Sequence, residues 1–291
     1  MLLLIATAIA GAGALPLGAG PSKPYPIEPF VQDHGAACGR RLGMVVLSVD
    51  ETIEHEYGRY FPYDGESTMY VARQHKGPDI DVGSLNETEA EIWNVSALLP
   101  DYAYDSVGFA CTSDAAVLGP DVVASLVAAG APVAAEAVTN PLTAAIRAFK
   151  ALGAKSVGVL LPYTQEVSGL VVDKFVEYDI PVSSVAIFNV VTDEAVSRID
   201  AASVLAAIRK LAADGADAVF VSCTNTRTID VIARAEALTG IPVVSSNSAM
   251  AWDMMRLAGM LTEDVKNDRA TFGGALFKVP VENQGPRHPC P

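Results

Sequence analysis

From residue 41 onward, the chain alternates short apolar runs with longer segments of helical periodicity. The short runs are rich in Val, Ile and Ala and show little polar alternation, which is typical of parallel strands buried on both faces. They predict strands at 42–48, 106–110, 131–134, 156–161, 182–188, 217–222 and 241–245. The pattern therefore predicts an α/β fold with mostly parallel sheet.

The longer segments repeat apolar residues at helical spacing, and several begin at Asn-Pro, Ser or Asp and stop at Gly. They predict helices at 121–129, 141–152, 167–178, 201–214, 228–238 and 248–258. The acidic segment 51–56 is interpreted as a solvated helical face. In a doubly wound sheet the loops at the carboxyl ends of the strands carry the ligands, so the functional site is expected on those loops.

One strand-to-turn junction occurs twice, as VGFACTSD at 107–114 and AVFVSCTNT at 218–226. Each copy is followed by a helical segment and then by an apolar run that contains proline, at 131–133 and 241–243. A duplicated βαβ unit explains this recurrence. We therefore predict two pseudosymmetric doubly wound lobes, each with a mostly parallel sheet, and an active site in the cleft between them.

The duplication also predicts how the chain is divided. We expect lobe 1 at 41–153, with 244–262 packing back on it, and lobe 2 at 154–243. Residues 1–40 are expected to form an N-terminal extension, and 263–291 an irregular tail. The first twenty residues resemble a signal peptide without the usual basic start, so a cytoplasmic location is expected, with export as the alternative.

Composition narrows the possible partners. The 291 residues are 51% hydrophobic and 19% charged, enough to bury a large core, and the net charge is −14. This acidity argues against nucleic acid and membrane surfaces as partners.

The four cysteines, at 38, 111, 223 and 290, are too scattered for a disulfide framework and show no metal-ligand spacing, so no metal is expected. Cys38 and Cys290 are interpreted as incidental thiols that would pair only on export.

The chemistry is expected at the two junctions, where Cys111 and Cys223 each follow a strand. A lone buried cysteine is usually inert, but two at equivalent places, each followed by threonine, favour a catalytic pair. If the two cysteines face each other across a cleft, one can act as a thiolate that takes a proton or adds to a double bond. The other then acts as a thiol that supplies a proton. A helix N-terminus is expected to lower the thiol pKa. Neighbouring donors for a carboxylate are Thr112, Ser113, Thr224 and Asn225.

Five segments carry a resemblance to a known group of enzymes: GMVVLSVDETIEHE at 43–56, ACTSDAAVLGP at 110–120, LPYTQEV at 161–167, SCTNTRT at 222–228 and SSNSAMAWDMMRLAG at 245–259. The chain resembles the aspartate/glutamate racemase superfamily, in the branch of maleate cis-trans isomerase, arylmalonate decarboxylase and the ectoine-utilization protein A group. The resemblance implies an enzyme without a cofactor, Cys111 and Cys223 as its catalytic residues, Tyr163 as a substrate contact, and a homo-oligomer.

Two positions depart from the maleate isomerase pattern. Asp50 stands where those enzymes have an asparagine, as in the ectoine-utilization group, and Asp193 replaces a second asparagine. An ionised Asp50 would repel the second carboxylate of maleate and attract an ammonium group, although it also suits a helix cap. Ser48 and Asn247 are further candidate substrate contacts, while Ser245 and its neighbours suit a cap.

These observations favour a racemase or epimerase that acts on a small carboxylate or amino acid. Three alternatives stay open. They are cis-trans isomerisation of maleate, decarboxylation of the arylmalonate type, and carboxylate binding without turnover. The resemblance weakens the decarboxylase alternative, because similar decarboxylases keep only one of the two cysteines.

Overall fold

The computed structural model describes residues 26–27, 29–32, 39–62, 65 and 67–281. Residues 39–281 belong to one compact unit, which is separate from Met1–Gly35. The expectations for the signal-like start, Cys38 and Cys290 fall outside the described residues.

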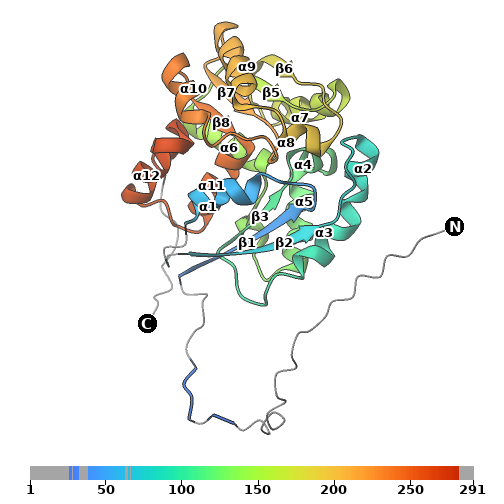
Figure 1. The fold of residues 1–291 in the computed structure, drawn as a ribbon, viewed down its shortest axis with the longest axis vertical. Coiled ribbons are helices and arrows are strands. Elements are labelled where there is room, and N and C mark those ends of the chain that lie inside the picture. Colours follow the sequence, from blue (N-terminus) through green and yellow to red (C-terminus); the bar gives the residue numbers. More distant parts are fainter. Residues whose placement is uncertain (1–25, 28, 33–38, 63–64, 66, 282–291) are drawn as a thin grey trace, which may run out of the picture. The chain divides into compact units, whose positions relative to one another are not determined.

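Two four-stranded parallel sheets form the two lobes of this unit. In Figure 1 the second sheet is drawn above the first. The first has the order β2-β1-β3-β4 and the second β6-β5-β7-β8, so the same topology occurs twice. This confirms the predicted two-lobed α/β fold. The strands are β1 Arg40–Leu47, β2 Ser67–Gln74, β3 Ser106–Ala110, β4 Val138–Thr139, β5 Val157–Leu161, β6 Val182–Ile187, β7 Ala218–Val221 and β8 Val243–Ser245.

Two strand predictions need correction. The predicted strand at 131–134 is absent, because Ala131 N bonds back to Val127 O at the end of a helix; Val138–Thr139 pairs with β3 instead. Strand β2 was not predicted, because its sequence STMYVARQ is polar. As an edge strand it is only partly buried, so it lacks the apolar run that marks the inner strands.

Helices connect the strands, and most predicted helices lie within a few residues of those observed. For example, α6 starts at Pro141 after the Asn140 cap and ends before left-handed Gly153. Among the described residues no single helix is long and apolar enough to cross a membrane; α4 and α5 reach that length only together, bent by 104°. The α-helices are α1 Ile53–Tyr60, α2 Val82–Glu87, α3 Glu89–Ser96, α4 Thr112–Leu118, α5 Pro120–Gly130, α6 Pro141–Leu152, α7 Gln165–Glu177, α8 Asp193–Ser197, α9 Ala201–Ala213, α10 Ile232–Thr239, α11 Ser246–Leu257 and α12 Glu263–Gly273.

The segment expected as an irregular tail folds from residue 263 to 278, into α12 and the short 3-10 helix Ala275–Lys278. The Thr262 hydroxyl accepts from Val265 N and caps α12, and Arg269 Nε donates to Tyr60 O at 2.8 Å. Phe277 stacks on the Tyr60 ring at 5.6 Å between centroids. The prediction was wrong here because α12 is mostly polar and is held by these few contacts.

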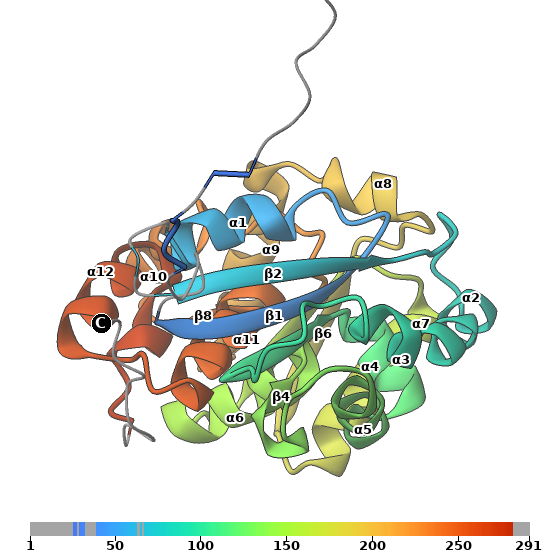
Figure 2. The same cartoon turned by 90° about the horizontal axis from the view of Figure 1, so that it is seen from below.

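Both faces of the first sheet are covered. Alternating residues of β1 point to opposite sides: Val45 packs in the cluster that includes α3 and α5, and Met44 in the one that includes α1 and α11. Figure 2 shows α3 and α5 side by side. In β3, a Cβ on Gly108 would lie 2.9 Å from Met254 Sδ, so α11 approaches this strand closely.

The helices that join the lobes cross over between them. The α6 ring of Phe149 packs edge-on against Phe220 of β7 and Phe175 of α7, so α6, which the sequence grouped with lobe 1, packs on lobe 2. Helix α11, which follows β8 of lobe 2, packs on β3 and β4 of lobe 1. Each lobe therefore contributes one helix to the core of the other.

Asp253 ties these two helices together. It is fully buried on α11, and its carboxylate accepts from Thr139 Oγ1 of β4 at 2.6 Å, Arg147 Nη1 of α6 at 2.6 Å and Arg256 Nε at 2.8 Å. A buried carboxylate is tolerated because charged donors satisfy it on both oxygens.

We expect Asp253→Ala to lower the free energy of unfolding by about 3 kcal/mol, because it leaves a buried hydroxyl and Arg147 without their acceptor. Urea denaturation measures this. Glu263→Gln is the control, since Glu263 is 82% exposed in its pair with Lys266 and should change stability little. A loss as small as that of the control would contradict the role assigned to Asp253.

Candidate functional site

Cys111 directly follows β3 and is the N-cap residue of α4. Its sulfur takes the place that a Ser or Asp oxygen usually occupies and accepts from Asp114 N at 3.4 Å. The Ser113 hydroxyl lies 3.4 Å from the same sulfur. Cys111 is 6% exposed, so it is nearly covered.

Cys223 has a different local geometry. It lies two residues beyond the end of β7 with a left-handed φ of 79°, and turns rather than a helix follow it until α10 begins at Ile232. The predicted helix at 228–238 therefore begins four residues late. A left-handed cysteine costs on the order of 1 kcal/mol, and such strain is concentrated at functional sites.

The two cysteine-threonine turns meet where the lobes join. Thr224 Oγ1 donates to the carbonyl of Ala110, the residue before Cys111, at 3.3 Å. On the other side, the hydroxyls of Thr112 and Ser246 lie 2.8 Å apart. Burial is the main cause that raises the pKa of Cys111, and nearby Cys223 adds a small contribution in the same direction.

Tyr163 lies near both sulfurs. It follows β5, is almost fully buried, and its phenol oxygen accepts from Ser222 Oγ at 3.3 Å. Burial raises the pKa of Tyr163 well above its usual value, and the neighbouring Cys223 and Cys111 side chains raise it further. The phenol is therefore neutral at ordinary pH and able to donate a hydrogen bond.

Asp50 fulfils one of the two roles that its sequence position suggested, that of a helix cap. Its Oδ1 accepts from Thr52 N at 2.8 Å and Ile53 N at 2.9 Å, which caps the start of α1. Its Oδ2 is buried and has no hydrogen-bond partner among the described residues. Burial raises the pKa of Asp50, although the Ile53 amide and the Thr224 hydroxyl oppose the shift.

Asn225 fixes the loops around Asp50. Its Oδ1 accepts from Glu51 N at 2.9 Å, and its Nδ2 donates to Asp193 O at 2.9 Å. Its backbone oxygen accepts from Thr52 Oγ1 at 2.9 Å. These bonds engage the Asn225 side chain in contacts that hold the two lobes together. Asn225 therefore orients the loops of the site and has no free donor.

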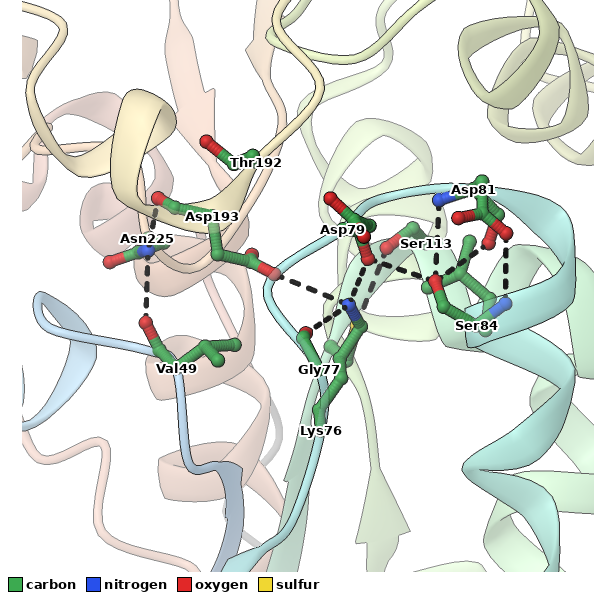
Figure 3. A network of polar contacts seen from close by, with 12 residues as sticks. Val49, Lys76, Gly77, Asp79, Asp81, Ser84, Ser113, Thr192, Asp193 and Asn225 are labelled. Atoms are coloured by element: carbon green, nitrogen blue, oxygen red, sulfur yellow. Dashed lines mark hydrogen bonds and ion pairs between the residues drawn. The ribbon is translucent and has the colours of Figure 1, made fainter.

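A buried lysine that the sequence analysis did not identify reaches Asp193. Lys76 follows β2, and its ammonium donates to Asp79 O at 2.6 Å, Gly77 O at 3.2 Å and Asp193 Oδ2 at 3.3 Å (Figure 3). Burial raises the pKa of Asp193 to about 6, and Lys76 opposes the shift. Recognising β2 as a strand would have placed Lys76 on a site loop. Ser48 is exposed and accepts from Lys76 N, so it supports this loop.

Asp114 is a second residue missed, although it lies in the repeated junction itself. It is 0% exposed, and neither carboxylate oxygen has a hydrogen-bond partner among the described residues. Burial raises the pKa of Asp114 to about 7, against the opposing effects of Cys111 and Lys76.

Glu56 corrects the interpretation of 51–56 as a solvated face. Its carboxylate is buried and accepts from Thr228 N at 2.6 Å, Ile229 N at 2.9 Å and Asn247 Nδ2 at 2.9 Å. Asn247 Nδ2 also donates to Thr224 O at 2.9 Å. Glu56 therefore holds the turn after Cys223, and Asn247 connects the two.

The remaining candidates at the start of α11 are structural. Ser245 and Ser248 form a reciprocal capping box, as expected for this segment. Trp252 packs in the core with 2% exposure. Within the described part of the chain, no group of three or more His, Cys, Asp or Glu is arranged to hold a metal ion.

Both thiols are protonated at neutral pH, because the pKa of each is raised. Burial is the main cause that raises the pKa of each; the next is Asp114 for Cys111 and Asp193 for Cys223. The expectation that a helix N-terminus lowers the thiol pKa is wrong here, because desolvation and the neighbouring acids outweigh the amide that bonds each sulfur.

The fold and the paired cysteine turns define a two-lobed enzyme class, and comparisons identify its family. Residues 81–270, about two thirds of the chain, match the arylmalonate decarboxylase family model. The chain belongs to this family. Arylmalonate decarboxylase from Bordetella bronchiseptica is 31% identical over 123 residues, 42% of this chain and 51% of that protein.

Maleate isomerases are similar over more of the chain. That of Nocardia farcinica is 25% identical over 226 residues, 75% of this chain and 89% of that protein. A structure of a cysteine-to-serine mutant of the Nocardia farcinica enzyme, with a covalently bound succinylcysteine intermediate, matches with a TM-score of 0.66 and 25% identity, covering 75% of this chain and 92% of that one.

The raised carboxyl pKa values predict that stability falls between mildly acidic and mildly basic pH. Between 3.8, the ordinary pKa, and about 7, Asp114 is protonated in the folded chain but ionised in the unfolded chain, so its stabilising contribution is lost as pH rises through that range. We expect Asp114→Asn to reduce the loss in unfolding free energy from pH 5 to pH 8 by on the order of 2 kcal/mol. Urea denaturation at both pH values measures this, and parallel losses in both proteins would contradict the shift.

Proposed function

We propose that this protein is an isomerase that uses no cofactor and moves a proton at the carbon next to a carboxylate, with Cys111 and Cys223 as its acid/base pair. The observation that carries the proposal is the hydrogen bond from Thr224 to Ala110 O, which joins the two cysteine turns directly. A buried inert thiol needs no such partner from the other lobe.

The chemistry follows from two thiols acting on opposite faces of one carbon. One sulfur, as thiolate, removes the alpha proton, and the thiol on the other side returns a proton to the planar intermediate. The product then has either configuration. In this proposal neutral Tyr163 and the hydroxyls of Thr112 and Ser113 donate hydrogen bonds to the carboxylate while negative charge develops on it.

The substrate we favour carries an amino group. Asp50 Oδ2 is buried without a hydrogen-bond partner among the described residues. Asp193 is the acid that raises the pKa of Cys223 most, after the effect of burial. An ammonium group would satisfy the free oxygen and offset the acidic surroundings, whereas a second carboxylate would be repelled. The same two aspartates support placement near the ectoine-utilization group.

Maleate cis-trans isomerisation is the second candidate, favoured by the similarity to maleate isomerases over three quarters of the chain. In that reaction one thiolate would add to the double bond, rotation about the resulting single bond would follow, and elimination would release the trans acid. The covalent succinylcysteine in the Nocardia farcinica enzyme is a precedent for such an adduct in that protein.

The discriminating experiment incubates the protein in deuterated water with small mono- and dicarboxylic acids, aminated and not, followed by NMR. The proposal predicts deuterium at the alpha carbon of an aminated acid, together with loss of optical activity. Fumarate formed from maleate would instead support the second candidate, and carbon dioxide release would indicate decarboxylation. No turnover of any member of the panel would contradict the proposal.

Replacing either cysteine tests the pair. We expect Cys111→Ser and Cys223→Ser each to lower kcat by at least about a hundredfold, because serine is a far weaker acid and base in the same position. Binding of the same acid, measured by calorimetry, should change little. A carboxylate-binding protein without activity would keep its affinity and show no turnover in any form, and retained turnover in either variant would refute the paired mechanism.

The preference for an ammonium group is tested at Asp50. Asp50→Asn keeps the cap, since the amide oxygen still accepts from Thr52 N, but removes the charge. We expect kcat/KM to fall about tenfold or more for an aminated acid and to fall less, or rise, for its non-aminated analogue. Ser48→Ala, at an exposed position on the neighbouring loop, is the control. Equal losses on both substrates would rule out the ammonium contact.

A further inference from the structure

Asp114 occupies an unusual position beside Cys111. It is the third residue of α4, one turn from the cap, and its backbone N–H donates to the Cys111 sulfur at 3.4 Å. Its side chain is fully buried and both carboxylate oxygens lack a hydrogen-bond partner among the described residues. An ionised carboxylate in such a place is unfavourable unless it is paired with a cation or takes up a proton.

The groups that face Asp114 come from several elements. Cys111 and Thr88 interact favourably with its carboxylate, Lys76 is the nearby cation, and Asp193 is the nearby acid. The Lys76 ammonium already donates to Asp79 O, Gly77 O and Asp193 Oδ2. Lys76 therefore supplies positive potential to Asp114 while its ammonium is bonded elsewhere. The Cys111 thiol is the other acid beside Asp114, because its sulfur accepts from Asp114 N at 3.4 Å and its side chain lowers the pKa of the Asp114 carboxyl.

We propose that Asp114 is the internal proton acceptor for Cys111, so that the thiol becomes a thiolate without releasing a proton to solvent. The S–H proton passes to a carboxylate oxygen, giving a thiolate and a neutral carboxylic acid, and it returns when the cycle ends. The pair keeps one negative charge throughout, and the charge moves from the Asp114 carboxylate, in the first turn of α4, to the Cys111 sulfur.

This inference rests on the proposed function in one respect: the thiolate needs the substrate of that reaction to act on. The proton transfer itself needs no substrate. In the resting protein the proton stays mainly on sulfur, because burial raises the pKa of Cys111 well above its usual range and that of Asp114 only to about 7. A substrate ammonium at the junction would stabilise the charge on sulfur and draw the proton to Asp114. Asp114 takes the proton of Cys111 and does not touch the substrate, so it is a positioning residue that acts through Cys111.

The test follows Cys111 itself and needs no substrate. The full chain is treated with iodoacetamide from pH 5 to pH 10, and the alkylation rate of Cys111 is read from peptide mass spectrometry. In the unmodified protein a minor thiolate population should appear as Asp114 ionises, which gives a step near pH 7 and a second rise at higher pH. In Asp114→Asn only one rise should remain, at the pKa of the thiol alone.

Two controls accompany this measurement. Cys223 in the same samples should show the same profile in both proteins, and Glu236→Gln, a remote, partly buried carboxylate that accepts from Val243 N and Ala275 N, should leave the step at Cys111 in place. A step near pH 7 that persists in Asp114→Asn overturns the inference. So does its absence in the unmodified protein. Because no substrate takes part, either result is independent of whether the proposed isomerase reaction is found.

A second measurement covers the case in which Asp114→Asn does not fold. Carbon-13 NMR of labelled aspartate carboxyl groups follows Asp114 in the unmodified protein and in Cys111→Ala. Removing the thiol removes an interaction that lowers the pKa of Asp114, so its titration should move to higher pH. An unchanged titration would show that the two groups do not share a proton and would overturn the inference.

Discussion

The site depends on a set of buried hydrogen bonds that join the two lobes at the cysteine turns. Thr224 bonds to Ala110 O, Asn225 to the loop after β1, and Glu56 to the residues that follow Cys223. Each bond crosses from one lobe to the other, and each is largely removed from water. Losing one partner would leave a buried polar group unsatisfied, so the relative placement of the sulfurs is fixed by the same bonds that hold the lobes together.

The lobe junction contains three buried acids, two of them near the buried Lys76 and one near Arg73. Asp50, Asp114 and Asp193 all have pKa values raised by burial, and Lys76 is bound to Asp193. This arrangement keeps the thiols protonated and leaves oxygens of Asp50 and Asp114 without hydrogen-bond partners among the described residues. A cationic substrate group would change both conditions at once, which links substrate binding to thiol activation through electrostatics alone.

The architecture was predictable because inner parallel strands are apolar runs, and the repeated Cys-Thr junction exposed the duplication. The polar edge strand β2 carries no such signal and was not predicted. Without that strand, Lys76 could not be placed on a loop of the site. Glu56 looked like a surface acid because the donors that bury it, at Thr228 and Asn247, are far away in sequence. Asp114 was visible in the motif, but its burial without partners is a property of packing that spacing does not encode.

The central claim is that both sulfurs reach one small molecule across the lobe junction. Treatment with 1,3-dibromoacetone, a short reagent that alkylates two thiols, followed by peptide mass spectrometry tests it directly. We predict a cross-linked pair of peptides that contain Cys111 and Cys223, formed within one chain. Adducts only on separate cysteines, with no bridge between these two under conditions that alkylate both, would contradict the account.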